Sequence, residues 1–148
     1  MKNSFTLLLF VLSYLATGQV VINELDSDTP STDDREFIEL KSTVPNFPLD
    51  GYVLVFFNGN ATSSTANQSY YTIDLDGLTT DANGIILIGN ALITPAPDKI
   101  LSDNIIQNGA DGVGLYLGNP SDFPEFTLAT TTNLIHALMY DTNDADAT

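Results

Sequence analysis

The amino-acid sequence predicts an all-β protein built as a single β-sandwich. Seven short runs of β-branched, aromatic and other apolar residues are separated by turns rich in Gly, Asn and Asp. No stretch of ten or more residues keeps an apolar stripe with the 3.6-residue period of a helix. The chain has 148 residues, of which 43% are hydrophobic, and this size suits one sandwich core rather than two domains.

The first 18 residues have the three parts of a secretory signal peptide. Lys2 supplies the positive charge, Phe5 to Ala16 form an apolar run, and small residues precede the predicted cut after Gly18. The alternative is an uncleaved membrane anchor, but the run is short for a membrane span. We therefore expect residues 1–18 to be a signal peptide and residues 19–148 a secreted, extracellular or cell-surface domain without a transmembrane span.

The first half of the domain predicts four strands from composition and flanking turns. These strands are Val20–Leu25, Arg35–Lys41, Tyr52–Phe57 and Tyr70–Leu75. The third is a run of aromatic and β-branched residues that the Asp50-Gly51 turn introduces. Residues 58–69 consist mostly of Asn, Ser, Thr and Ala, and this loop is expected to be mobile because it has little to bury.

The second half predicts three more strands, which are Ile85–Ile88, Val113–Leu117 and Leu134–Tyr140. The four consecutive apolar residues of Ile85–Ile88 predict burial on both faces of the sheet. Residues 91–112 contain Pro95, Pro97 and an Asn108-Gly109 turn, and they predict irregular structure that could hold a short helical turn.

The charge and the cysteine content exclude several functions. There are 19 acidic and 4 basic residues, and without Lys2 the balance is 19 against 3, a formal net charge of −16. Such a surface repels phosphate backbones, so direct nucleic-acid binding is not expected. The absence of cysteine excludes disulfides, thiol catalysis and zinc–thiolate sites.

An acidic loop is the candidate metal site. Asp26, Asp28, Asp33 and Asp34 fall within nine residues, and calcium prefers hard oxygen ligands of this kind. The spacing is not that of an EF-hand, because Pro30 occupies a ligand position. The two interpretations are a solvated acidic loop and a weak calcium site; no other cofactor is expected.

No catalytic residue is predicted. A nucleophilic hydrolase places a base beside its nucleophile. The only histidine, His136, is expected on a strand face shared with Leu134, Leu138 and Tyr140, where a histidine is usually part of the packing. Neither a Gly-x-Ser-x-Gly motif nor a phosphate-binding glycine motif occurs.

The carboxylates and aromatic residues give further expectations. Glu36 and Glu39 are three residues apart and should point to opposite faces of their strand. Glu24 and Glu39 could be neighbours across adjacent strands. One of Tyr70 and Tyr71 is expected to be exposed beside the 58–69 loop.

Six short motifs occur in an order that carries a resemblance. They are Val21-Ile22-Asn23-Glu24-Leu25, Glu36-Phe37-Ile38-Glu39-Leu40, Leu49-Asp50-Gly51-Tyr52, Gly84 to Gly89, Asn108 to Tyr116, and Ile135 to Asp141. In this order they resemble the lamin tail domain family in its secreted bacterial form. The resemblance extends from Val20 to Asp141.

The resemblance implies an immunoglobulin-like β-sandwich without catalytic residues. The family usually has one more strand, so the domain is expected to lack its last strand and the chain to be a fragment. The implied function is a non-catalytic interaction or attachment module with a protein or cell-surface partner. The alternatives are an N-terminal accessory domain of an extracellular nuclease or phosphatase whose catalytic part lies beyond residue 148, and a calcium-dependent adhesin module.

Overall fold

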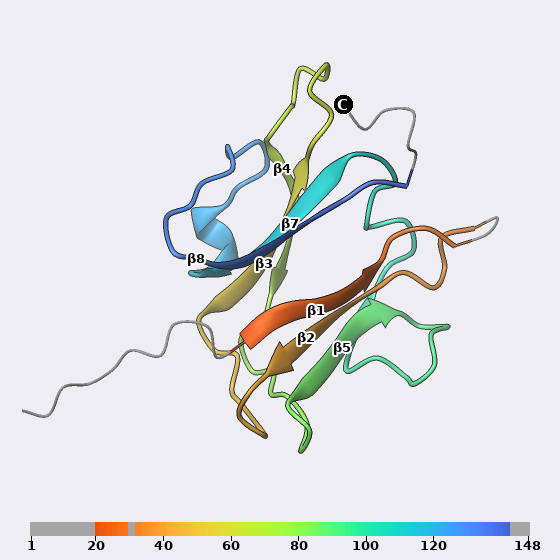
Figure 1. Cartoon of the computed structure of the whole chain (residues 1–148), viewed down its shortest axis with the longest axis vertical. Helices are drawn as coiled ribbons and strands as arrows, with labels where there is room; N and C mark the ends of the chain where they lie inside the picture. Colours follow the sequence, from red (N-terminus) through yellow and green to blue (C-terminus); the bar gives the residue numbers. More distant parts are fainter. Residues whose placement is uncertain (1–19, 30–31, 143–148) are drawn as a thin grey trace, which may run out of the picture.

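The predicted all-β sandwich is confirmed by a computed structural model, which describes residues 20–29 and 32–142 (Figure 1). The predicted signal peptide, residues 1–18, lies outside the described residues. The elements are β1 (Val20–Asp26), β2 (Phe37–Ser42), β3 (Tyr52–Asn58), β4 (Ser69–Asp74), β5 (Ile85–Asn90), β6 (Lys99–Leu101), β7 (Asp111–Leu117), the 3-10 helix η1 (Pro120–Asp122) and β8 (Leu134–Tyr140). Over this part of the chain, no helix is long and apolar enough to cross a membrane.

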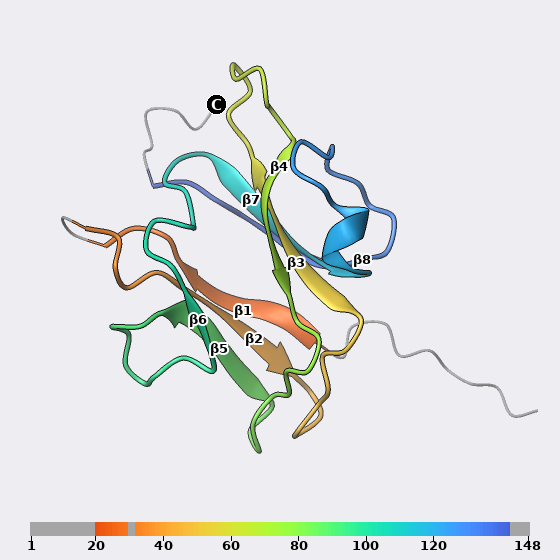
Figure 2. The same ribbon diagram turned by 180° about the vertical axis from the view of Figure 1, so that it is seen from behind.

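Two four-stranded sheets form the two layers, as Figures 1 and 2 show from opposite sides. The first sheet has the order β1-β2-β5-β6 and the second the order β4-β3-β7-β8. The pairing is antiparallel except between β5 and β6, which run parallel. A bulge between Ile22 and Glu24 shifts the register of β1 on β2, so that Glu24 lies opposite Glu39 as expected.

The core lies between the sheets and follows from the two-residue alternation of side chains along a strand. In β2, Ile38 and Leu40 are fully buried, and from the opposite sheet Leu54, Phe56 and Leu115 are buried against them. Each such side chain stabilises the fold by about 2 kcal/mol relative to an exposed position. This apolar layer packs against the inner face of the first sheet. The candidate site lies on the outer face of the same sheet.

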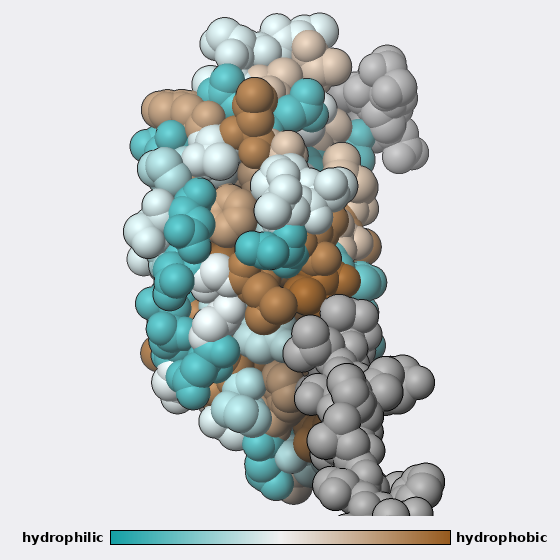
Figure 3. All heavy atoms as spheres, turned by 90° about the vertical axis from the view of Figure 1, so that its left-hand side faces the viewer, coloured by the Kyte–Doolittle hydropathy of each residue, from teal (hydrophilic) through white to brown (hydrophobic). Residues whose placement is uncertain are grey.

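The outer face of the second sheet is covered by the segment after β7. Phe123, next to η1, packs on Tyr116 with ring centroids 4.6 Å apart, and both belong to a second apolar cluster with Val53 and Val55. Figure 3 views the side of the molecule where this segment lies, and hydrophobic residues gather in the middle of that side. Phe126 and Leu128, in the same segment, are 56% and 64% exposed.

Three sequence-based expectations need correction. Residues 91–112 contain no helical turn; they hold the short strand β6, and the helical turn is η1, farther along the chain. Ile85–Ile88 is not buried on both faces: Ile86 and Ile88 are buried, whereas Ile85 and Leu87 are half-buried on the outer face. Neither Tyr70 nor Tyr71 is exposed, because both pack against the core and contact Phe56.

In the loop before β4, polar groups form hydrogen bonds with one another. The Asn58 side-chain amide donates hydrogen bonds to Ser63 Oγ (3.1 Å) and Thr65 Oγ1 (2.8 Å). The main chain adds turns at Ser63 and Gln68. Hydroxyl and amide side chains thus replace the missing apolar contacts, and the mobility of this loop stays a prediction.

Candidate functional site

A hollow of about 600 Å³ lies on the outer face of the first sheet. We call it the outer hollow. Its floor is apolar and is formed by Phe37 from β2 and by Ile85 and Leu87 from β5. One wall is the segment Leu92 to Pro95, which follows β5.

Strand alternation explains the floor. Ile38, Leu40, Ile86 and Ile88 point into the core and are buried, so the residues between them point outward. The outward residues of β5 are apolar, and burial inside the hollow, rather than in the core, keeps Ile85 and Leu87 half-buried.

A glycine permits the wall to fold back onto the sheet. A Cβ atom at Gly89 would lie 2.8 Å from Ile93 Cδ1, 2.7 Å from Phe37 Cβ and 2.6 Å from the Glu36 carbonyl oxygen. Any side chain at this position would therefore push the wall away from the floor. Gly89 sets the depth of the outer hollow.

The rim of the hollow is acidic on the β1 side. Glu24 on β1 lies directly opposite Glu39 on β2, and both line the hollow together with Asp26. Glu39 Oε1 accepts a hydrogen bond of 2.7 Å from the Asn23 side-chain amide. Arg35, which also lines the hollow, has its guanidinium 3.8 Å from Asp34.

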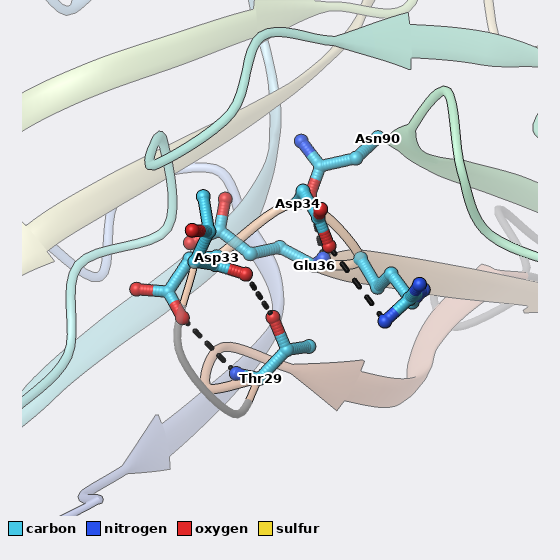
Figure 4. A network of polar contacts seen from close by, with 7 residues as sticks. Thr29, Asp33, Asp34, Glu36 and Asn90 are labelled. Atoms are coloured by element: carbon cyan, nitrogen blue, oxygen red, sulfur yellow. Dashed lines mark hydrogen bonds and ion pairs between the residues drawn. The ribbon is translucent and has the colours of Figure 1, made fainter.

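Behind the rim, a buried carboxyl group joins three distant segments (Figure 4). The Glu36 side chain is fully buried, and its Oε2 accepts hydrogen bonds from the backbone N–H groups of Ile105 (3.0 Å) and Ile106 (3.3 Å). Its backbone N–H donates to Asn90 Oδ1, and the Asn90 amide donates to the Ser102 carbonyl oxygen at 2.9 Å. Figure 4 shows Glu36 beside Asn90 and Asp33.

The second Glu36 oxygen is buried without a partner. Oε1 has no hydrogen-bond partner among the described residues. Burial raises the pKa of Glu36 from 4.5 to about 7, the carboxylates of Asp33 and Asp103 add to the rise, and the N–H groups of Ile106 and Ile105 oppose it. This carboxyl group is therefore close to half protonated near neutral pH.

The four aspartates predicted to bind calcium make separate contacts. Asp26 accepts a hydrogen bond from the Asp28 backbone N–H at 3.3 Å, and Asp34 lies beside Arg35. Asp33 accepts hydrogen bonds from the Thr29 backbone N–H (3.1 Å) and the Asn108 side chain (2.9 Å). Within residues 20–29 and 32–142, no three His, Cys, Asp or Glu side chains gather in an arrangement that could hold a metal ion. Calcium binding by this loop stays a prediction.

No family model, curated protein or solved structure matches this chain. The lamin-tail resemblance thus stays a prediction based on the order of the six motifs, and the fold itself is established by the sheets described above.

His136 is half-buried in β8, opposite Leu115. The expected face is wrong at Leu134, because a register shift in the pairing of β7 with β8 moves that side chain to the outer cluster around Val53, whereas Leu138 packs against the main core. His136 Nδ1 is buried and has no hydrogen-bond partner in the described part of the chain. The imidazole is therefore part of the packing of β8.

Two tyrosines, Tyr70 and Tyr140, pack against the main core and form a hydrogen bond with each other. Tyr70 Oη and Tyr140 Oη are 3.1 Å apart, and the Gln107 backbone N–H donates to Tyr70 Oη at 3.3 Å. Burial raises the pKa of Tyr70 to about 12 and raises the pKa of Tyr140 as well. Both hydroxyl groups therefore stay protonated, and the pair is structural.

The sequence alone did not indicate the outer hollow or the burial of Glu36. The four consecutive apolar residues of Ile85–Ile88 predict a strand, but the pattern does not indicate which two side chains face outward. Glu36 is buried by Ile105 and Ile106, which lie about 70 residues away in sequence. The wall has a local signal in the Gly89-Asn90 pair, a dipeptide that is typical of a turn after a strand.

Proposed function

We propose that this chain is a non-catalytic secreted module of the lamin-tail type, which binds a protein or cell-surface partner through the outer hollow. The observation that carries this proposal is the hollow itself, about 600 Å³, in which apolar side chains from β2 and β5 lie beside carboxylates from β1 and β2. Ligand sites commonly combine these properties. The floor residues belong to two hydrogen-bonded strands, β2 and β5, and a site built on paired strands suits recognition without a large rearrangement.

The non-catalytic part of the proposal is argued from the placement of two groups that could act as a base, His136 and Glu36. His136 is half-buried in β8, and its Nδ1 atom is buried without a hydrogen-bond partner among the described residues. Glu36, the carboxyl group with a pKa of about 7, is fully buried. A general acid or base must reach its substrate directly or through one water molecule, and Glu36 has no exposed surface for this.

The test uses the full chain, expressed with its own N-terminus and a C-terminal fluorescent tag in the source organism. We expect the tagged protein on the cell surface or in the medium, beginning at Gln19 by mass spectrometry. Leu87→Glu places a charge on the floor of the hollow and should release the surface-bound fraction into the medium. Ile100→Glu is the matched control, because Ile100 lies in the same sheet and is 67% exposed.

Two results would contradict the proposal. One is equal surface retention of wild type, Leu87→Glu and Ile100→Glu, provided that all three have the same melting temperature. The other is nuclease or phosphatase activity of the purified chain.

A further inference from the structure

We propose that the outer hollow accepts an extended segment of a partner protein in which lysine or arginine alternates with apolar residues. This inference rests on the proposed function and names the chemistry of the partner.

The first observation is the arrangement of the outer face in rows. Glu24 on β1 lies opposite Glu39 on β2, and Glu39 lies opposite Leu87 on β5. In the next row, Asp26 on β1 lies opposite Phe37 on β2. Carboxylates thus line the β1 side of the hollow and apolar side chains line the β5 side, and β2 between them carries one residue of each kind.

The second observation is that two carboxylates occupy directly opposed positions. Such cross-strand neighbours have Cβ atoms about 5 Å apart, and like charges placed there destabilise a sheet. Within the part of the chain that the structure describes, the one hydrogen bond to either carboxylate is donated by the Asn23 side chain to Glu39. A cation between Glu24 and Glu39 would relieve their repulsion.

The described chain does not supply that cation. Arg35 lies 3.8 Å from Asp34, and Lys41 Nζ donates a hydrogen bond of 2.6 Å to the Asn83 carbonyl oxygen. The third basic residue, Lys99, is on β6, which is separated from β1 by two strands. Among the described residues no basic side chain forms an ion pair with Glu24 or Glu39.

The spacing of the rows along the strands matches the side-chain spacing of an extended partner peptide. Successive rows are two residues apart, about 6.7 Å, and the side chains on one side of an extended peptide repeat at the same interval. A segment that lies along β2 with its side chains directed sideways therefore turns one set toward Glu24 and Asp26 on β1 and the other set toward Ile85 and Leu87 on β5. Alternating basic and apolar residues satisfy both surfaces at once.

The test measures binding of short fluorescent peptides to the full chain by polarisation at about 0.15 M salt. The three probes alternate leucine with lysine, with glutamate or with serine. We expect the lysine peptide to bind and the other two to bind at least about ten-fold more weakly. The double variant Glu24→Gln/Glu39→Gln should lower affinity for the lysine peptide about ten-fold.

The matched control is Glu125→Gln/Asp74→Asn, which makes the same change in net charge at two exposed residues outside the hollow. It should change the affinity less than about two-fold at this ionic strength. Equal losses in both double variants would show diffuse attraction to an acidic protein and would overturn the inference. Equal binding of the lysine and serine peptides, or no binding of the lysine peptide, would also overturn it.

Failure of this inference is distinguishable from failure of the proposed function. If Leu87→Glu releases the protein from cells while Glu24→Gln/Glu39→Gln does not weaken the lysine peptide, the hollow binds a partner that is not basic. If Leu87→Glu has no effect on retention, the proposed function fails whatever the peptides show.

Discussion

Replacing Glu36 by glutamine should remove the effect of pH on folding stability at one buried position. The rise of the Glu36 pKa from 4.5 to about 7 corresponds to about 3 kcal/mol of folding free energy. Below about pH 4.5 the carboxyl group is protonated in both folded and unfolded chains, and the folded state carries no penalty. Between about pH 4.5 and 7 the unfolded chain has released this proton while the folded chain keeps it, so the folded state loses stability over this range, and the loss reaches about 3 kcal/mol once the pH has passed about 7.

The Glu36→Gln variant keeps the acceptor oxygen for the Ile105 and Ile106 N–H groups. Its amide NH₂ replaces the Oε1 atom that has no partner among the described residues, and an unsatisfied donor there costs about 1 kcal/mol. The variant should therefore be about 2 kcal/mol more stable than wild type at pH 8 and about 1 kcal/mol less stable at pH 4.

The assay is urea unfolding of both proteins at pH 4, 6 and 8, with the difference in unfolding free energy as the readout. Glu125→Gln is the control, because it removes the same charge from an exposed position and reports the general benefit of lowering the net negative charge. A difference between Glu36→Gln and wild type that does not change sign or size between pH 4 and pH 8 would refute the reasoning.

Three further predictions concern Gly89, Tyr70 and the binding of calcium. Gly89→Ala should destabilise the fold by about 2 kcal/mol, because its Cβ would lie 2.6 Å from the Glu36 carbonyl oxygen; an unchanged melting temperature would contradict this. Tyr70→Phe should cost about 1–2 kcal/mol in chemical unfolding, because it removes the 3.1 Å contact with Tyr140 and the acceptor for the Gln107 N–H, and a neutral result would show that the pair is dispensable. Excess calcium should raise the melting temperature slightly relative to a chelator, and the same melting temperature in both would refute weak calcium binding.

Strand positions were predictable from the sequence where the pattern is local. The runs Val113–Leu117 and Leu134–Tyr140 consist of apolar residues bounded by turns, and they correspond to β7 and β8. β6 was missed, because three residues between Asp98 and Ser102 are too few to display a two-residue alternation. That strand exists because its backbone pairs with β5, and such pairing leaves no mark in a short sequence.

The candidate site was less predictable, because it depends on contacts between segments that are far apart in the sequence. The cross-strand neighbours Glu24 and Glu39 could be proposed from the order of two strands, and their register confirms it. The depth of the hollow depends on Gly89 and on a wall that folds back across the sheet. The burial of Glu36 depends on a loop far along the chain, and single-residue composition carries no information on such contacts.

Residue-resolved NMR can show whether a partner segment binds in the outer hollow. The lysine–leucine peptide is added stepwise to the ¹⁵N-labelled full chain, and backbone amide shifts are followed. We expect saturable shifts at Glu39, Leu87 and Ile93, and much smaller shifts at the exposed Leu128 on the other sheet's side of the molecule. Shifts spread evenly over the acidic surface, or confined to residues outside the hollow, would contradict it.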